Sequence, residues 1–419
     1  MPFDVFQQIF FLSLTSNLVN DFKGTQTSLQ RALQQGLTSV LPVSVPGWQV
    51  VWGPVVWKNK PDEHTTGPDN SWYVAFHPSL EFEDGSIHPT YVIAIAGTPT
   101  ESEYVWINQN FAVNSVADFN AWVAGGIQNE PVVVPAARIV QGTPYIATGT
   151  VRAVHLLLTT PAPGGAEGAG TTLLDFIKDV DKSGSNRFIA TGHSLGGALS
   201  PSLALALVSA EALLAHKTMT YPTAGPSPGN RGFTDLFTET FPVRKLDERF
   251  SYRGWNLNLV NTLDIVPQAW CPLRSNSPEQ NLGNIPPIYG KPVLPIVLGS
   301  SIVLALHALS SGTVFCPLPS QDFTGTPPSA PPTSLEEFLQ IVGPEHQGAY
   351  LDEVGFALPT LNESHVLGNG LTQKAEDERR FNYPVIAGFE WAREHPEEAQ
   401  KEIERVENTP EAMAFLHYE

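Results

Sequence analysis

The fold is decided by the stretch Arg187-Phe-Ile-Ala-Thr-Gly-His-Ser-Leu-Gly-Gly-Ala-Leu199. It begins with apolar and β-branched residues, passes a serine flanked by glycines, and continues with small residues and leucine. This order predicts a buried strand, an abrupt turn with Ser194 at its apex, and then a helix. The glycines at positions 192 and 196 carry no side chain, so the strand and the helix can approach each other closely.

The five residues from Gly192 to Gly196 fit the pattern Gly-x-Ser-x-Gly, which is typical of the nucleophile elbow of α/β-hydrolases. Such a turn holds its serine in a strained backbone conformation, so that the Ser194 hydroxyl projects above the sheet. The backbone amide of Leu195 then faces the oxyanion that forms when Ser194 attacks a carbonyl carbon. An ordinary strand-to-helix turn with a glycine-rich corner is the alternative interpretation.

The elements predicted around this turn alternate between strand and helix, as in a doubly wound α/β fold. We therefore expect one α/β-hydrolase domain over 1–419, with a mostly parallel sheet and a core at about 90–352. Proline- and serine-rich residues at about 271–333 break the alternation and are expected to form an insertion, and 353–419 a helical C-terminal extension. Strands are expected at 45–57, 71–76, 91–96, 219–222 and 257–260, and helices at 101–129, 171–180 and 198–216.

Composition limits the classes of partner. The chain has 419 residues and a formal net charge of −19, which disfavours nucleic acid and anionic membrane surfaces as electrostatic partners. The eleven histidines are scattered and no Cys–His group has metal-ligand spacing, so neither a metal nor a cofactor is expected. The longest apolar stretch, Val293 to Leu309, is about 17 residues long and interrupted, so we expect a buried or substrate-covering segment and no transmembrane helix.

Two features leave the cellular compartment open. The first fifteen residues are apolar but lack a basic segment, because the first Lys or Arg is Lys23, and we expect them to form a helix packed on the body. A chain whose secretory signal had been removed would look the same, so a cytoplasmic protein and a mature secreted form are both compatible. The only two cysteines, Cys271 and Cys316, are compatible with a disulfide and with two buried thiols.

A serine nucleophile needs a partner acid and a partner base. Its hydroxyl requires a histidine base at neutral pH, and that histidine requires a carboxylate that fixes its tautomer. In α/β-hydrolases the order along the chain is serine, acid, histidine. Asp264 is the best acid, because it directly follows a predicted strand and would stand at the same sheet edge as Ser194. Its alternative role is a turn or a helix cap.

The histidine base is harder to choose from the sequence. We favour His346, in a helix-like segment after Asp264, and keep His365 as the second candidate. His307 lies inside the apolar run, where a structural role is expected. The remaining two, His395 and His417, lie in a charged tail and are expected to face solvent.

Five segments, taken in order, resemble the class 3 lipases, the family of fungal triacylglycerol lipases and feruloyl esterases. The resemblance covers about 90–352, and the elbow and Asp264-Ile-Val-Pro267 are its most specific parts. Two departures are an alanine at position 96, where the family often has arginine, and the 82 residues between Asp264 and His346, which the insertion accounts for. The matching segments are Ile95-Ala-Gly-Thr98, Thr191 to Leu199, Tyr221-Pro-Thr-Ala-Gly-Pro-Ser-Pro-Gly-Asn230, Asn261-Thr-Leu-Asp-Ile-Val-Pro267 and Glu345-His-Gln-Gly-Ala-Tyr350.

The resemblance implies a serine hydrolase that acts on carboxylic esters, with acylglycerols favoured, through Ser194, Asp264 and His346. It also implies that Thr98 supplies the second oxyanion donor beside Leu195, and that lipid substrates are met at a transient lipid interface. Short-chain, feruloyl-type and phospholipid esters are alternatives, and so is peptidase activity. An alternative outside the enzymes is a lipid-binding or interaction module whose triad has lost its activity. The aromatic stretch at 106–122 and the apolar run at 293–309 are both candidates for a cover over the acyl-binding site.

Overall fold

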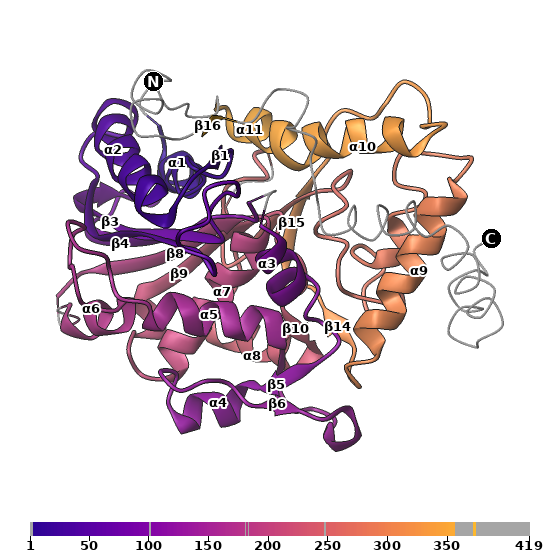
Figure 1. The fold of residues 1–419 in the computed structure, drawn as a ribbon, viewed down its shortest axis with the longest axis horizontal. Helices are drawn as coiled ribbons and strands as arrows, with labels where there is room; N and C mark the ends of the chain where they lie inside the picture. Colours follow the sequence, from indigo (N-terminus) through magenta and orange to yellow (C-terminus); the bar gives the residue numbers. More distant parts are fainter. Residues whose placement is uncertain are drawn as a thin grey trace.

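The computed structural model describes residues 3–99, 102–180, 182, 184–246, 249–356 and 372–373. A seven-stranded sheet lies at the centre of this part of the chain (Figure 1). In spatial order its strands are β2 (Gln49–Trp57), β3 (Asn70–Glu81), β4 (Ile87–Ile95), β8 (Arg187–His193), β9 (Thr218–Thr223), β13 (Asn258–Asn261) and β15 (Ser320–Phe323). The five strands from β4 to β15 run parallel to one another, whereas β2 and β3 pair antiparallel. The sheet is therefore mixed and mostly parallel, as predicted.

Helices cover both faces of this sheet. Side chains alternate along each strand, so Tyr73 and Ala75 pack into the apolar cluster on one face, and Trp72 and Val74 into the cluster on the other. Both faces are therefore buried, which a parallel sheet requires. The first face carries α1 (Val5–Thr15) and α2 (Gln26–Ser44), and the second carries α5 (Thr148–Thr159), α6 (Leu173–Asp179) and α7 (Leu195–Ser209).

The helix expected from the N-terminal residues is present as α1. Asp4 and Gln7 form a capping box at its start, and nine of its eleven residues are buried. At the same end, Nε2 of Gln7 donates a 2.9 Å hydrogen bond to the carbonyl oxygen of Val354, the last residue of α11 (Ala349–Val354). The helix therefore joins the beginning and the end of the described core.

Two of the expected helices are shorter in the structure. The stretch 101–129 contains α3 (Glu103–Val105), the π-helix η1 (Trp106–Asn110), β5 (Val116–Asp118) and α4 (Phe119–Gly125). Helix is interrupted there because β5 pairs with β7 (Tyr145–Ala147) in a second sheet. The elbow helix α7 ends at Ser209 rather than near 216, and Glu211 just beyond it has a left-handed backbone with φ of 57°.

The proline-rich segment contributes to both sheets. Its helix α9 (Pro295–Leu309) is followed by β14 (Phe315–Cys316) and β15, and β15 forms the parallel edge strand next to β13. The expected extension at 353–419 lies almost wholly outside the described residues. Within the residues that are described, no helix is both long and apolar enough to cross a membrane. The second sheet runs β14, β10 (Gly229–Asn230), β7, β5 and β6 (Val133–Val134).

Candidate active site

Ser194 stands at the turn between β8 and α7. Its backbone has φ of 60° and ψ of −125°, a region that residues with side chains rarely adopt. The Ser194 amide donates a 3.0 Å hydrogen bond to the carbonyl oxygen of Thr223 on β9, which holds the turn in place. A side chain at Gly192 would collide with the carbonyl oxygen of Gly196, so the close approach expected of these glycines is confirmed.

Asp264 and His346 meet at the same edge of the sheet. Asp264 lies three residues after β13, and His346 lies in the π-helix η5 (Pro344–Gly348) between α10 (Leu335–Gly343) and α11. Nδ1 of His346 is 2.8 Å from Oδ2 of Asp264, and their side chains are 1% and 0% exposed. Because a carboxylate only accepts, the neutral ring carries its proton on Nδ1 and its lone pair on Nε2.

Two further groups fix the Asp264 carboxylate. The amide of Val266 donates a 2.9 Å hydrogen bond to Oδ1, and the hydroxyl of Tyr350 donates one of 2.9 Å to Oδ2. Burial, with the nearby charge of Asp264, raises the pKa of Tyr350 well above its ordinary value, so the phenol stays a donor. His346 in η5 and Tyr350 in α11 are four positions apart on continuous helix, and both contact one carboxylate oxygen.

The segment that carries His346 is tied to the end of β13 by Asn261. Nδ2 of Asn261 donates to Oε2 of Glu345 at 2.6 Å and to the Glu345 carbonyl oxygen at 2.8 Å. The backbone N–H of Asn261 donates a 3.0 Å hydrogen bond to the hydroxyl oxygen of Tyr350. Glu345 is buried, and burial raises the pKa of its carboxyl. The sequence contains Asn261 in a matched segment, but nothing in the pattern pointed to this role.

The ring of His346 lies against the elbow. Its centroid is 4.7 Å from that of His193, the residue directly before Ser194, and the ring of Tyr350 is 5.1 Å from His193 on another side. Nδ1 of His193 lies 2.9 Å from the hydroxyl oxygen of Thr223. Burial, and then the proximity of His346, lower the pKa of His193 well below its ordinary value, so this ring stays neutral.

Thr98 and Leu195, the candidate oxyanion residues, follow two neighbouring strands, β4 and β8. Leu195 is the first residue of α7, so its amide is one of those that find no partner within the helix. Thr98 follows β4, and the preceding Gly97 is so close that a Cβ there would lie 3.2 Å from Cβ of Ser194. Nδ2 of Asn110, at the end of η1, donates a 3.0 Å hydrogen bond to the hydroxyl oxygen of Thr98.

Comparison with family profiles gives one match. Residues 92–272 match the family profile described as Lipase (class 3). This segment, less than half of the chain, is similar to the class 3 lipases. It contains the elbow, the Thr98 loop and Asp264, whereas His346 lies beyond the matched residues.

Comparison with solved structures shows that the class 3 lipase segment sits in a lipase-like α/β-hydrolase fold. The chain is similar to the crystal structure of M37 lipase, with 22% identity and a TM-score of 0.61, over 88% of this chain and 98% of that one. It is also similar to nonglycosylated Yarrowia lipolytica LIP2 lipase, with 16% identity and a TM-score of 0.40, over 63% and 73% of the two chains. No curated protein matches the sequence.

One apolar cluster joins α9, a candidate cover, to the loop that follows Asp264. Val297 and Leu304 of α9 share this cluster with Trp106, Trp270 and Ile265. Two other aromatic residues of the 106–122 stretch, at positions 119 and 122, belong instead to the core on the α7 face.

Of the other histidines that follow Asp264, the structure describes one, and it describes both cysteines. His307 on α9 is structural, as expected, because its Nε2 is 2.8 Å from the carbonyl oxygen of Phe111. Cys271 and Cys316 are buried free thiols. Three histidines that follow Asp264 lie outside the described residues, namely His365, His395 and His417.

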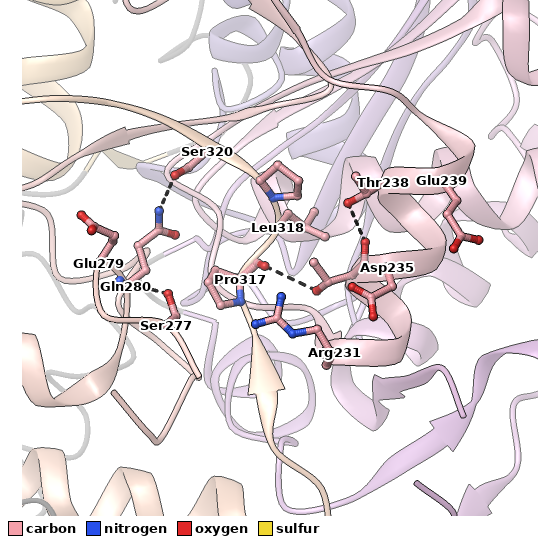
Figure 2. Close-up of a pocket in the computed structure, with 12 residues that line it drawn as sticks. Arg231, Asp235, Thr238, Glu239, Ser277, Glu279, Gln280, Pro317, Leu318 and Ser320 are labelled. Atoms are coloured by element: carbon pink, nitrogen blue, oxygen red, sulfur yellow. Dashed lines mark hydrogen bonds between the residues drawn. The ribbon is translucent and has the colours of Figure 1, made fainter. Parts of the chain in front are cut away.

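A separate cavity of about 530 Å³ lies beside α8 (Arg231–Thr240), and Figure 2 shows that its lining is largely polar. Arg231, Asp235 and Glu279 line it, but Ser194 and the other two triad candidates do not. Among the described residues, no cluster of His, Cys, Asp and Glu side chains could hold a metal ion.

Proposed function

We propose that this chain is a serine hydrolase that cleaves carboxylic esters, with acylglycerols as the favoured substrates. The observation that carries the proposal is the 2.8 Å contact between His346 and Asp264, with the His346 ring packed against the residue before Ser194. The strained backbone of Ser194 at the strand-to-helix turn supports a nucleophile at this position.

In the proposed reaction, Oγ of Ser194 attacks the ester carbonyl carbon while Nε2 of His346 takes the hydroxyl proton. Asp264 holds the ring in the required tautomer and stabilises the imidazolium that forms. The C–O bond to the alcohol then breaks, His346 returns the proton to the leaving alcohol, and an acyl-enzyme remains. Water releases the acyl group by the same route, so the chemistry requires no cofactor.

The backbone amides of Thr98 and Leu195 are proposed to hold the oxyanion of each tetrahedral intermediate. A donor of this kind contributes about 3–4 kcal/mol to the stability of the transition state in other hydrolases. The position of both residues beside Ser194, one after β4 and one at the start of α7, supports this assignment.

An acylglycerol substrate is favoured by the apolar cluster next to Asp264. Trp106, Trp270 and the α9 side chains are buried against one another in this cluster, so a displacement of α9 would expose apolar surface to an acyl chain, and α9 is the proposed cover. Lipid esters of this kind are met at a transient interface with lipid. A short-chain or feruloyl-type esterase would need less of this surface.

Two measurements test the proposal. A fluorophosphonate probe should label the wild-type chain and leave Ser194→Ala unlabelled, whereas a lapsed lipid-binding module would leave both unlabelled. Rates should then be compared for p-nitrophenyl esters of two to sixteen carbons and for emulsified triacylglycerol. A preference for long chains and for the emulsion supports a lipase, and a preference for acetate supports a short-chain esterase.

A further inference from the structure

Two asparagines after α1 hold the backbone of Gly97, which precedes the candidate oxyanion residue Thr98. Oδ1 of Asn17 accepts a 2.8 Å hydrogen bond from the Gly97 amide. Nδ2 of Asn20 donates a 3.3 Å hydrogen bond to the Gly97 carbonyl oxygen and one of 2.9 Å to Oδ1 of Asn17. Both polar groups of one backbone residue are thus bound by side chains about eighty positions earlier in the chain.

The contact of Asn20 fixes the direction of the Thr98 amide. The Gly97 carbonyl and the Thr98 N–H belong to one planar trans peptide group, in which they point in opposite directions. A hydrogen bond that holds the carbonyl toward Asn20 therefore aims the N–H away from Asn20. A carbonyl that accepts a hydrogen bond also polarises its peptide group, which strengthens the N–H as a donor.

The orientation of the Asn20 amide follows from its neighbours. Its Nδ2 faces two oxygen atoms, Oδ1 of Asn17 and the carbonyl of Gly97, so the reversed amide would place oxygen against oxygen. Asn17 is fixed in turn, because its Nδ2 donates a 3.0 Å hydrogen bond to the carbonyl oxygen of Ser13 on α1.

The helix that precedes these asparagines, α1, is itself held against the sheet. The hydroxyl of Tyr73 on β3 donates a 2.8 Å hydrogen bond to the carbonyl oxygen of Leu12, and it lies 2.6 Å from the hydroxyl of Thr15. On the opposite side, Gly97 has no room to move toward the elbow, because a Cβ at this position would be only 2.9 Å from the carbonyl oxygen of His193. The Gly97 backbone is therefore held by the two asparagines after α1 and lies against the turn that carries Ser194.

We propose that Asn20, supported by Asn17, is a positioning residue that orients the Thr98 amide toward the oxyanion. This inference rests on the proposed hydrolase function. It extends the active site to the N-terminal helix, which lies outside the residues that match the class 3 lipase profile.

The test compares Asn20→Ala and the isosteric Asn20→Asp with Ser16→Ala. Asn20→Asp keeps the shape but has no donor for the Gly97 carbonyl. Ser16→Ala is the matched control, because the Ser16 hydroxyl donates a 2.6 Å hydrogen bond to the Ser13 carbonyl oxygen in the same turn. The hydroxyl also accepts a 3.4 Å hydrogen bond from Nδ2 of Asn17, but that nitrogen keeps its shorter bond to Ser13 in the variant. Each variant is measured for kcat and KM on a p-nitrophenyl ester and for the Ki of a trifluoromethyl ketone, which forms a tetrahedral oxyanion adduct with a serine. Melting temperature monitors the fold.

Both Asn20 variants should lose about tenfold or more in kcat with KM within about twofold, because an oxyanion donor acts mainly in the transition state. The Ki of the ketone should rise by a similar factor, and Ser16→Ala should match the wild type in both. The proposal is overturned if folded Asn20→Asp keeps kcat and Ki within twofold of wild type, or if Ser16→Ala loses as much. A wild-type chain that neither hydrolyses esters nor reacts with the fluorophosphonate would instead refute the hydrolase function on which the inference rests.

Discussion

The hydroxyl of Tyr350 donates its 2.9 Å hydrogen bond to the same Asp264 oxygen that contacts His346. Tyr350→Phe removes this donor from a buried carboxylate. It also removes the hydroxyl oxygen that accepts a hydrogen bond from the backbone N–H of Asn261. Loss of such buried partners typically costs about 1–3 kcal/mol each, so the free energy of unfolding should fall by about 2–6 kcal/mol. We also expect kcat to fall by about tenfold, because His346 loses part of the support for its orientation. Denaturant titration and steady-state kinetics measure both effects; unchanged kcat would show that the phenol does not support the acid.

Ser194→Ala should abolish ester hydrolysis while leaving the fold intact, because it removes only the hydroxyl at the apex of the turn. A loss of about 10⁴-fold or more in kcat is expected for a missing nucleophile. The circular dichroism spectrum and the melting temperature serve as the control for folding. Activity within tenfold of wild type would refute the nucleophile.

His346→Ala should lose as much activity as Ser194→Ala, because the members of a triad act as a unit and their effects do not add. His365→Ala, the matched substitution at the other candidate, should retain most activity. The comparison is made in kcat/KM on one p-nitrophenyl ester. If the two results were exchanged, His365 would be the base; if neither variant lost activity, the triad proposed for this part of the chain would be wrong.

His193→Asn should flatten the dependence of stability on pH. The pKa of His193 is lowered well below 6.5 in the folded state, so below pH 6.5 the unfolded chain binds a proton that the native chain does not. Wild-type stability is therefore lost as the pH falls from about 6.5, by at most about 1.4 kcal/mol per pH unit from this group. Asparagine has no such titration and can still bond to Thr223. Urea denaturation of both proteins at pH 7.5, 6.0 and 5.0 gives the difference; equal slopes would contradict a buried neutral ring.

Much of the fold could be predicted from local sequence patterns. The elbow, the strands next to it and the N-terminal helix depend on apolar periodicity and on glycines within a few residues, and all appear near their expected positions. The helix expected over 101–129 is broken by β5, because pairing with a distant strand outweighed the local helical pattern. For the same reason β15 could not be recognised in the proline-rich segment, since its four residues become a strand only beside β13.

In the candidate site, too, local patterns marked some residues, and contacts between distant residues could not be predicted. Ser194 and Asp264 each lie next to a strand that the sequence shows, so their common edge followed from fold and chain order. Five histidines follow Asp264, so chain order and the helix-like segment only favoured His346, and the family resemblance added support for it. The contacts of Asn20 with Gly97 and of Asn261 with Glu345 join residues more than seventy positions apart, and no local pattern marks an asparagine for such a partner.

The bond between Gln7 and Val354 joins residues 347 positions apart, which bears on how the chain is made. Of the described helices, α1 is translated first and α11, which contains its partner Val354, is translated last. Throughout that interval its largely apolar surface has no complete core to enter, and such surface promotes aggregation of nascent chains. We therefore expect the N-terminal helix to need protection by chaperones during translation. In a host with few chaperones, slower growth at low temperature should raise the soluble yield of this chain.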